Sequence, residues 1–224
     1  MNIKFISGLV GFLVACGPDR DFEDKNIFGS QTVGTSVSTS VGSSSSSGQT
    51  SPPWSQDNVG YNTDQELPAW LSWKGFPEGK MTPADLTNMS IGAWFDPDGT
   101  KGINAVLFLT SKYDCAACAK ESKELQARIE NWNLDNKGVK VVVLVINNKT
   151  DGFPDLSSTL LWKSQYGLLD ATVVSDPNIT FAVASTFSTP LRTIVDPRKM
   201  KVVAVTEGYS DDYSTLENLA SENK

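Results

Sequence analysis

Histidine is missing from this 224-residue sequence. Serine and cysteine hydrolases that use a Ser-His-Asp or Cys-His arrangement need an imidazole base, so the absence of histidine excludes them. It also removes the commonest metal ligand in proteins. Any chemistry that this chain performs must therefore come from other side chains.

Positive charge is also scarce. The sequence has 19 lysines and arginines against 26 aspartates and glutamates, which gives a formal net charge of -7. Nonspecific attraction to nucleic acid, or to an anionic membrane surface, needs the opposite sign of charge. We therefore expect no nucleic-acid partner.

The opening stretch, MNIKFISGLVGFLVAC, has the layout of a secretory signal. Lys4 is followed by apolar or small residues from 5 to 15, a run too short to span a bilayer. Leu13-Val14-Ala15-Cys16 resembles the lipobox of bacterial lipoproteins, in which the signal is cut before the cysteine and the thiol is lipidated. The alternative is a plain signal peptide with an incidental cysteine.

The lipobox resemblance has consequences for location. It implies a signal peptide over residues 1–15 and a membrane anchor on lipidated Cys16, outside the cytoplasm, where disulfides persist. Residue 17 is glycine and not aspartate. By resemblance to Gram-negative lipoproteins, this favours the periplasmic side and the outer membrane.

A polar segment separates this N-terminus from the rest. Nine of the seventeen residues from 35 to 51 are serine. Such a composition cannot bury enough apolar surface to offset its ordering entropy. We therefore expect residues 16–63 to hold the lipidated cysteine and a disordered Ser/Gly-rich tether, and residues 64–224 to form one domain. Trp70, Trp73 and Trp94, in the first part of this domain, are expected to pack in its core.

The remaining sequence alternates between strand and helix patterns, which predicts an α/β domain with a mixed sheet. One expected helix has Cys118, Ser122, Leu125, Ile129 and Trp132 on a single face. The expected elements are strands at 103–109, 139–146 and 171–175, helices at 115–132 and 157–166, a hairpin of 191–196 with 201–207, and a last helix from about residue 210.

The second and third cysteines lie in Cys115-Ala116-Ala117-Cys118, at the start of the expected helix. A helix N-terminus favours an anion, so it can lower the pKa of Cys115 and activate its thiolate. Cys118 lies one turn deeper and can attack a mixed disulfide formed on Cys115. The spacing therefore suits two-step dithiol exchange.

Two other interpretations compete. A structural zinc site needs four ligands, and with Cys16 lipidated and no histidine only two good ligands remain. We expect no metal and no other cofactor. A permanent structural disulfide is also possible, although a loop this short gains only about 2 kcal/mol in the chain-entropy model.

From residue 92 to residue 220, the order of elements, the CAAC motif and Thr189-Pro190 before the hairpin resemble the thioredoxin fold. The redoxin branch of membrane-anchored TlpA/ResA-type thiol–disulfide oxidoreductases fits best. This resemblance implies a three-layer domain, with Pro190 in a cis peptide bond beside the cysteines. Thr189 would then offer backbone hydrogen bonds to a protein disulfide or dithiol substrate.

Glu121 extends the resemblance, because CxxCxxE recurs in that branch. The resemblance implies that its carboxylate takes a proton from Cys118 or raises a thiol pKa. The alternative is an exposed helix glutamate paired with Lys112, Lys120 or Lys123.

Several features depart from the family pattern. Asp114 replaces the usual tryptophan before the first cysteine and would oppose formation of a thiolate. Leu109 stands where cytoplasmic thioredoxins have a buried acid, and the Ala-Ala dipeptide lacks the usual proline. Lys112 also breaks the threonine motif that peroxiredoxins need, and the CxxxC and distant histidine of copper chaperones are absent.

The sequence thus favours a lipid-anchored enzyme with Cys115 as nucleophile, Cys118 as resolving thiol and Glu121 as a proton-handling group. The alternative is a thioredoxin-like binding module with a permanent disulfide.

Overall fold

The computed structural model describes residues 52–184 and 186–224. The expected signal peptide, Cys16 and the serine-rich part of the expected tether lie outside these residues. In the described part, no helix has both the length and the apolar character needed to cross a bilayer.

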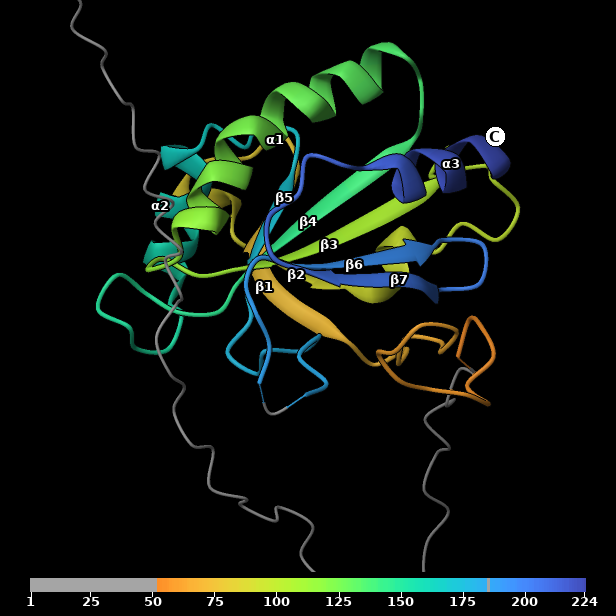
Figure 1. Cartoon of the computed structure of the whole chain (residues 1–224), viewed down its shortest axis with the longest axis horizontal. Coiled ribbons are helices and arrows are strands. Elements are labelled where there is room, and N and C mark those ends of the chain that lie inside the picture. Colours follow the sequence, from red (N-terminus) through yellow and green to blue (C-terminus); the bar gives the residue numbers. More distant parts are fainter. Residues whose placement is uncertain (1–51, 185) are drawn as a thin grey trace, which may run out of the picture. The chain divides into compact units, whose positions relative to one another are not determined.

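Within the described residues, seven strands form one mixed sheet, and three α-helices pack against it (Figure 1). The strands are β1 (Ser72–Phe76), β2 (Thr87–Ser90), β3 (Ala105–Ser111), β4 (Val139–Val145), β5 (Thr172–Ser175), β6 (Leu191–Asp196) and β7 (Lys201–Glu207). The α-helices are α1 (Ala116–Leu134), α2 (Leu156–Gln165) and α3 (Ser214–Glu222), and two short 3-10 helices span Pro83–Asp85 and Ile91–Trp94.

The strand order is β2-β1-β5-β4-β3-β6-β7. β3, β4 and β5 are parallel, whereas β6 runs antiparallel to β3 and β1 runs antiparallel to β5. The arrangement β4-β3-β6-β7, with α1 between β3 and β4 and α3 after β7, is that of a thioredoxin-like fold. The predicted α/β class and mixed sheet are therefore confirmed.

The central strands are buried on both faces because their side chains alternate between two apolar clusters. On one face the odd-numbered residues of β3 and β4 pack with buried residues of all three α-helices. The predicted apolar face of α1 lies here, with Cys118, Ser122, Leu125, Ile129 and Trp132 all buried.

In the part of the chain that the structure describes, the opposite face is covered without an α-helix. The even-numbered residues of β3 and β4 pack there against Trp73, Trp94 and Phe181, which come from β1, a 3-10 helix and the segment after β5. The third layer is therefore largely irregular structure that precedes β3.

Trp70 differs from its expected place in the core, because its exposed fraction is 74%. Leu71 and Trp73 are buried, so the alternation of side chains along the chain entering β1 directs Trp70 to the other side.

Packing also begins before residue 64, where we expected the domain to start. Trp54 is 7% exposed, its Nε1 donates to the carbonyl oxygen of Leu67 at 2.8 Å, and its ring lies 5.0 Å from that of Phe95. The apolar indole thus anchors the segment that precedes β1.

Candidate dithiol site

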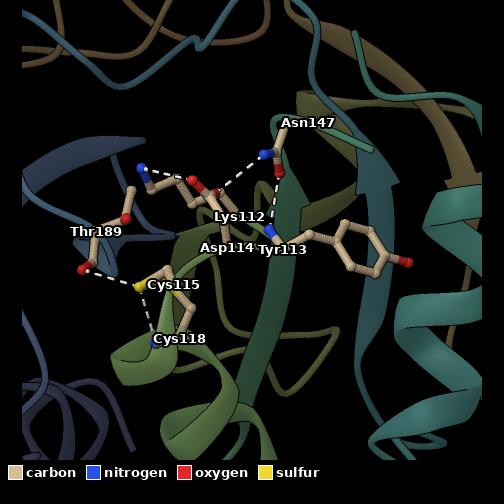
Figure 2. Close-up of a disulfide and its surroundings, with 7 residues drawn as sticks. All are labelled: Lys112, Tyr113, Asp114, Cys115, Cys118, Asn147 and Thr189. Carbon is tan, nitrogen blue, oxygen red and sulfur yellow. Dashed lines mark hydrogen bonds and ion pairs between the residues drawn. A yellow bond between two sulfur atoms is a disulfide. The ribbon is translucent and has the colours of Figure 1, made fainter. Parts of the chain in front are cut away.

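Cys115 and Cys118 lie where β3 leads into α1, and they form a disulfide with their Cα atoms 5.2 Å apart (Figure 2). Cys115 is the N-cap of α1, and its Sγ accepts a hydrogen bond from the backbone N–H of Cys118 at 3.1 Å. The first turn of a helix carries unpaired N–H groups and a partial positive charge. The same position can therefore stabilise a thiolate on Cys115 when the disulfide is reduced.

The peptide bond between Thr189 and Pro190 is cis, as the sequence predicted. The carbonyl oxygen of Thr189 lies 3.3 Å from Sγ of Cys115 (Figure 2). The structure therefore brings together four of the predicted site residues from two parts of the chain that are 74 positions apart.

Both cysteines are covered by protein. Cys115 is 1% exposed and Cys118 is 0% exposed. Any partner that reacts with Sγ of Cys115 must therefore first displace part of this cover.

Asp114, the residue before the first cysteine, is held by two neighbours. Its Oδ1 accepts a hydrogen bond from the side-chain amide of Asn147 at 3.2 Å, and its Oδ2 lies 3.5 Å from Nζ of Lys112. Figure 2 shows the carboxylate directed toward these two groups, whereas Sγ of Cys115 points toward Thr189. The negative charge beside Cys115 is thus partly offset by Lys112.

Asn147 follows β4 and was not singled out from the sequence. It is 7% exposed, and its side-chain oxygen accepts a hydrogen bond from the backbone N–H of Tyr113 at 2.8 Å. It therefore fixes the backbone just before the cysteine pair as well as the Asp114 carboxylate.

Glu121 is buried, so the interpretation as an exposed helix glutamate is wrong. It is 1% exposed, and its Oε1 accepts hydrogen bonds from Nε of Arg192 at 2.6 Å and from the hydroxyl of Tyr213 at 2.9 Å. Burial raises the pKa of Glu121 above its usual range, and the pairing with Arg192 and the Tyr213 hydroxyl opposes that rise.

Arg192 is the other residue that the sequence reasoning missed. It lies in β6, two positions after Pro190, and its side chain is 4% exposed. Its Nη1 donates to the carbonyl oxygen of Asp212 at 3.0 Å, and its Nη2 donates to that of Ser210. An arginine inside an expected central strand was the available signal, because such a charge is rarely buried without a partner.

Among residues 52–184 and 186–224, no three histidine, cysteine, aspartate or glutamate side chains are grouped so that they could hold a metal ion.

Comparisons with known proteins add the following. No protein-family model matches the chain, and no curated protein matches it in sequence. Solved structures with similar coordinates include a mitochondrial 2-Cys peroxiredoxin from Plasmodium falciparum, with 16% identity and a TM-score of 0.48, over 68% of this chain and 88% of that one.

Two thiol:disulfide interchange proteins are also similar. A putative DsbE from Chlorobium tepidum has 16% identity and a TM-score of 0.47, over 75% of this chain and 99% of that one. A protein from Bacteroides sp. has 14% identity and a TM-score of 0.45, over 73% and 90%. The thioredoxin-like fold of this chain is defined by its own strand order and directions.

Proposed function

We propose that this chain is a thiol–disulfide oxidoreductase that acts on protein disulfides outside the cytoplasm. The observation that supports it most is the position of the Cys115–Cys118 pair, at the N-terminus of α1 and beside the cis peptide bond of Thr189 and Pro190. A purely structural cross-link needs neither an N-capping sulfur nor an adjacent backbone carbonyl.

The reaction begins from the reduced pair. The thiolate of Cys115 attacks one sulfur of a substrate disulfide, forms a mixed disulfide and releases the first substrate thiolate. Cys118 then loses its proton and attacks Sγ of Cys115, which forms the intramolecular disulfide and releases the second substrate thiolate. Two electrons pass to the substrate, and each substrate thiolate takes up a proton. An external dithiol must then reduce the pair, and the reverse sequence oxidises a substrate dithiol.

Two groups support this sequence of steps. The backbone of Thr189 lies at the nucleophile and can pair with the main chain of a bound substrate. Glu121 lies one helical turn after Cys118 and can take its proton.

The second candidate function is a binding module with a permanent disulfide. The burial of Cys115, at 1% exposed, favours it, because a working nucleophile must meet its substrate. The redox potential separates the two candidates, since structural disulfides lie below about -300 mV and resist reduction by glutathione, whereas working ones lie higher.

Trapping in cells tests the enzyme directly. We expect Cys118→Ser to accumulate mixed disulfides with other proteins through Cys115, and Cys115→Ser to accumulate none. If neither variant traps a protein, the module is the better description.

We further propose that lipidated Cys16 anchors the protein to a membrane, and that residues 17 to about 51 form a tether. The support is the lipobox-like ending of the apolar N-terminal run. Fractionation of cells that express Cys16→Ser tests the anchor, because loss of the acyl chains should move the protein to the soluble fraction. Unchanged membrane association would leave Cys16 as an incidental cysteine.

A further inference from the structure

The buried ion pair between Glu121 and Arg192 has an unusual geometry. Arginine and carboxylate groups often pair through two parallel hydrogen bonds. Here Arg192 reaches one carboxylate oxygen through Nε, while its Nη1 and Nη2 donate to the backbone carbonyls of Asp212 and Ser210. The chain segment before α3 therefore holds the guanidinium in an orientation in which only one of the two carboxylate oxygens receives a hydrogen bond from it.

The carboxylate oxygen without a hydrogen bond is Oε2 of Glu121. It is buried and has no hydrogen-bond partner among the described residues, whereas Oε1 has two. A buried acceptor without a partner destabilises the fold, because it has lost its hydrogen bonds to water. A pair that served stability alone would be expected to satisfy both oxygens, since the desolvation of a buried ion pair is offset only by good geometry and full hydrogen bonding.

The position of Glu121 shows what the free oxygen can do. Glu121 follows Cys118 by three residues on α1, and both side chains are buried on the side of α1 that packs against the sheet. Residues three apart on a helix are neighbours. Oε2 therefore belongs to a buried carboxylate one helical turn from Cys118, the residue whose thiol must lose its proton in the second step of the exchange.

The charged and titratable groups around Glu121 come from three elements. Arg192 comes from β6, Tyr213 precedes α3, and Arg128 and the two cysteines belong to α1 or its N-cap. β3 contributes no charge, because Leu109 is the residue paired with Arg192 across the two strands. Arg192 is thus the cation in direct contact with the carboxylate.

Resting on the proposed function, we propose that Arg192 is a positioning residue that keeps Glu121 ionised with Oε2 free, so that this oxygen takes the proton of Cys118 when Cys118 attacks the mixed disulfide. The proton moves from Sγ of Cys118 to Oε2, the new Sγ–Sγ bond forms as the bond to the substrate sulfur breaks, and the substrate disulfide is the oxidant. Without Arg192, burial would raise the pKa of Glu121 further and favour the protonated carboxyl, which cannot accept a proton.

Tyr213 completes the arrangement. Its hydroxyl donates to the same oxygen as Arg192, and the guanidinium of Arg192 lies 4.2 Å from the centre of its ring. The ring contact and the shared acceptor hold the guanidinium and the hydroxyl together at Oε1, and Oε2 is left without a hydrogen bond.

The two exchange steps can be observed separately with Ellman's reagent. The full chain carrying Cys16→Ser is reduced and mixed with the reagent in stopped flow. The first equivalent of thionitrobenzoate reports attack by Cys115, and the second equivalent reports attack by Cys118 on the mixed disulfide. The rate of the second step is measured across the pH range in each variant.

We expect Arg192→Met to slow the second step about 100-fold at pH 7, the lower end of the usual contribution of general-base catalysis, with recovery as pH rises. Arg192→Lys, which keeps the charge, should restore most of the rate. Glu121→Gln should show the same loss, and adding Arg192→Met to it should cause little further loss, because both act on one group. Arg128→Met is the matched control: Arg128 also lies over the Tyr213 ring, at 4.6 Å, and is not hydrogen-bonded to Glu121.

Three outcomes decide between the ideas. If Arg192→Met lowers only the stability measured by urea unfolding and leaves the second-step pH profile unchanged, Arg192 has a structural role and the positioning proposal is wrong. If Glu121→Gln also leaves that profile unchanged, Glu121 is not the proton acceptor. If the folded, reduced protein with both cysteines releases no thionitrobenzoate at all, the proposed dithiol activity itself fails.

Discussion

Asp114 is the residue at which the local charge of this site can be tested most directly. A carboxylate next to Cys115 disfavours a thiolate there, whereas the N-terminus of α1 favours one. The structure shows a third contribution, because Nζ of Lys112 lies 3.5 Å from Oδ2 of Asp114 and Asn147 holds Oδ1. The net effect on Cys115 therefore depends on how well Lys112 offsets Asp114.

We predict that Asp114→Asn raises, and Lys112→Met lowers, the rate at which iodoacetamide alkylates Cys115 at pH 7 in the reduced Cys118→Ser protein. Asp114 is about half exposed, so each change should be modest, about two- to fivefold, and should shrink at high salt. Lys123→Met, an exposed lysine of α1, is the control. A slower reaction in Asp114→Asn would show that the carboxylate supports the thiolate by another route.

Sequence could predict the residues that a local motif places, and it missed those that contact the site from elsewhere. The cysteine spacing and Thr189-Pro190 are local patterns, and both residues of each pattern lie at the site. Asn147 meets Tyr113 across 34 positions and Arg192 meets Glu121 across 71. No periodicity links such pairs, so their roles follow only from how β3, β4 and β6 align.

At the scale of the elements, local patterns again predicted more than long-range pairing. β3, α1, β4, α2, β5 and the β6–β7 hairpin all lie within a few residues of their expected ranges, while α3 begins at Ser214 and not near residue 210. The insertion of β1 beside β5 was not predicted. β1 is short and half exposed, and its partners β2 and β5 follow it at very different separations along the chain.

α2 carries a buried charge that the sequence did not reveal. Lys163 is 0% exposed, and its Nζ donates to the carbonyl oxygens of Pro77 and Ala171. Burial lowers the pKa of Lys163 to about 8, although Glu78 and Asp170 oppose the change. The folded protein therefore holds this proton less tightly than the unfolded chain does.

This difference predicts a stability that increases with pH. Between about pH 8 and 10.5, the ordinary pKa of lysine, the unfolded chain keeps the proton that the folded protein has released, so the free energy of unfolding rises with pH. Relative to Lys163→Met, the stability of the wild-type chain should increase by up to about 3 kcal/mol across that window. Urea unfolding of both proteins at several pH values measures it.

Comparing the wild-type chain with Lys163→Met removes the effect of other titrating groups on stability, because these groups are present in both proteins. Burial raises the pKa of Tyr113 to about 12 and also raises that of Tyr213, so both tyrosines destabilise the fold as pH rises above 10 in either protein. Lys123→Met, which removes an exposed lysine of α1, is the matched control. If the free energy of unfolding of Lys163→Met changed with pH in the same way as that of the wild type, the buried ammonium of Lys163 would not be destabilised in the fold.

At the scale of the whole described region, the segment before β1 completes the fold at two places. Residues 65–67 run along the open edge of β7, where Leu67 donates its N–H to Met200 and Val202 donates to Gln65. This pairing covers strand groups that would otherwise be exposed at the end of the sheet. Trp54 packs beneath the same segment through its bond to Leu67.

The position of Trp54 leads to a prediction about where the domain begins. A chain that starts at residue 52 should be as stable as the full chain, whereas one that starts at residue 64 should lose about 3–5 kcal/mol, the usual cost of removing a buried tryptophan side chain. Trp54→Ala in the full chain should lose a similar amount. Trp54→Phe keeps a ring against Phe95 but loses the hydrogen bond from Nε1 to Leu67, so it should cost only about 1 kcal/mol.

Two other outcomes would contradict this prediction. If the chain starting at 64 were as stable as the chain starting at 52, while Trp54→Ala were still destabilising, residues 52–63 would contain strain that cancels the stabilisation by Trp54. If both shortened chains and both Trp54 variants were as stable as the full chain, the apolar cluster on this face of the sheet, which includes Trp73 and Phe108, would fold without the segment that contains Trp54.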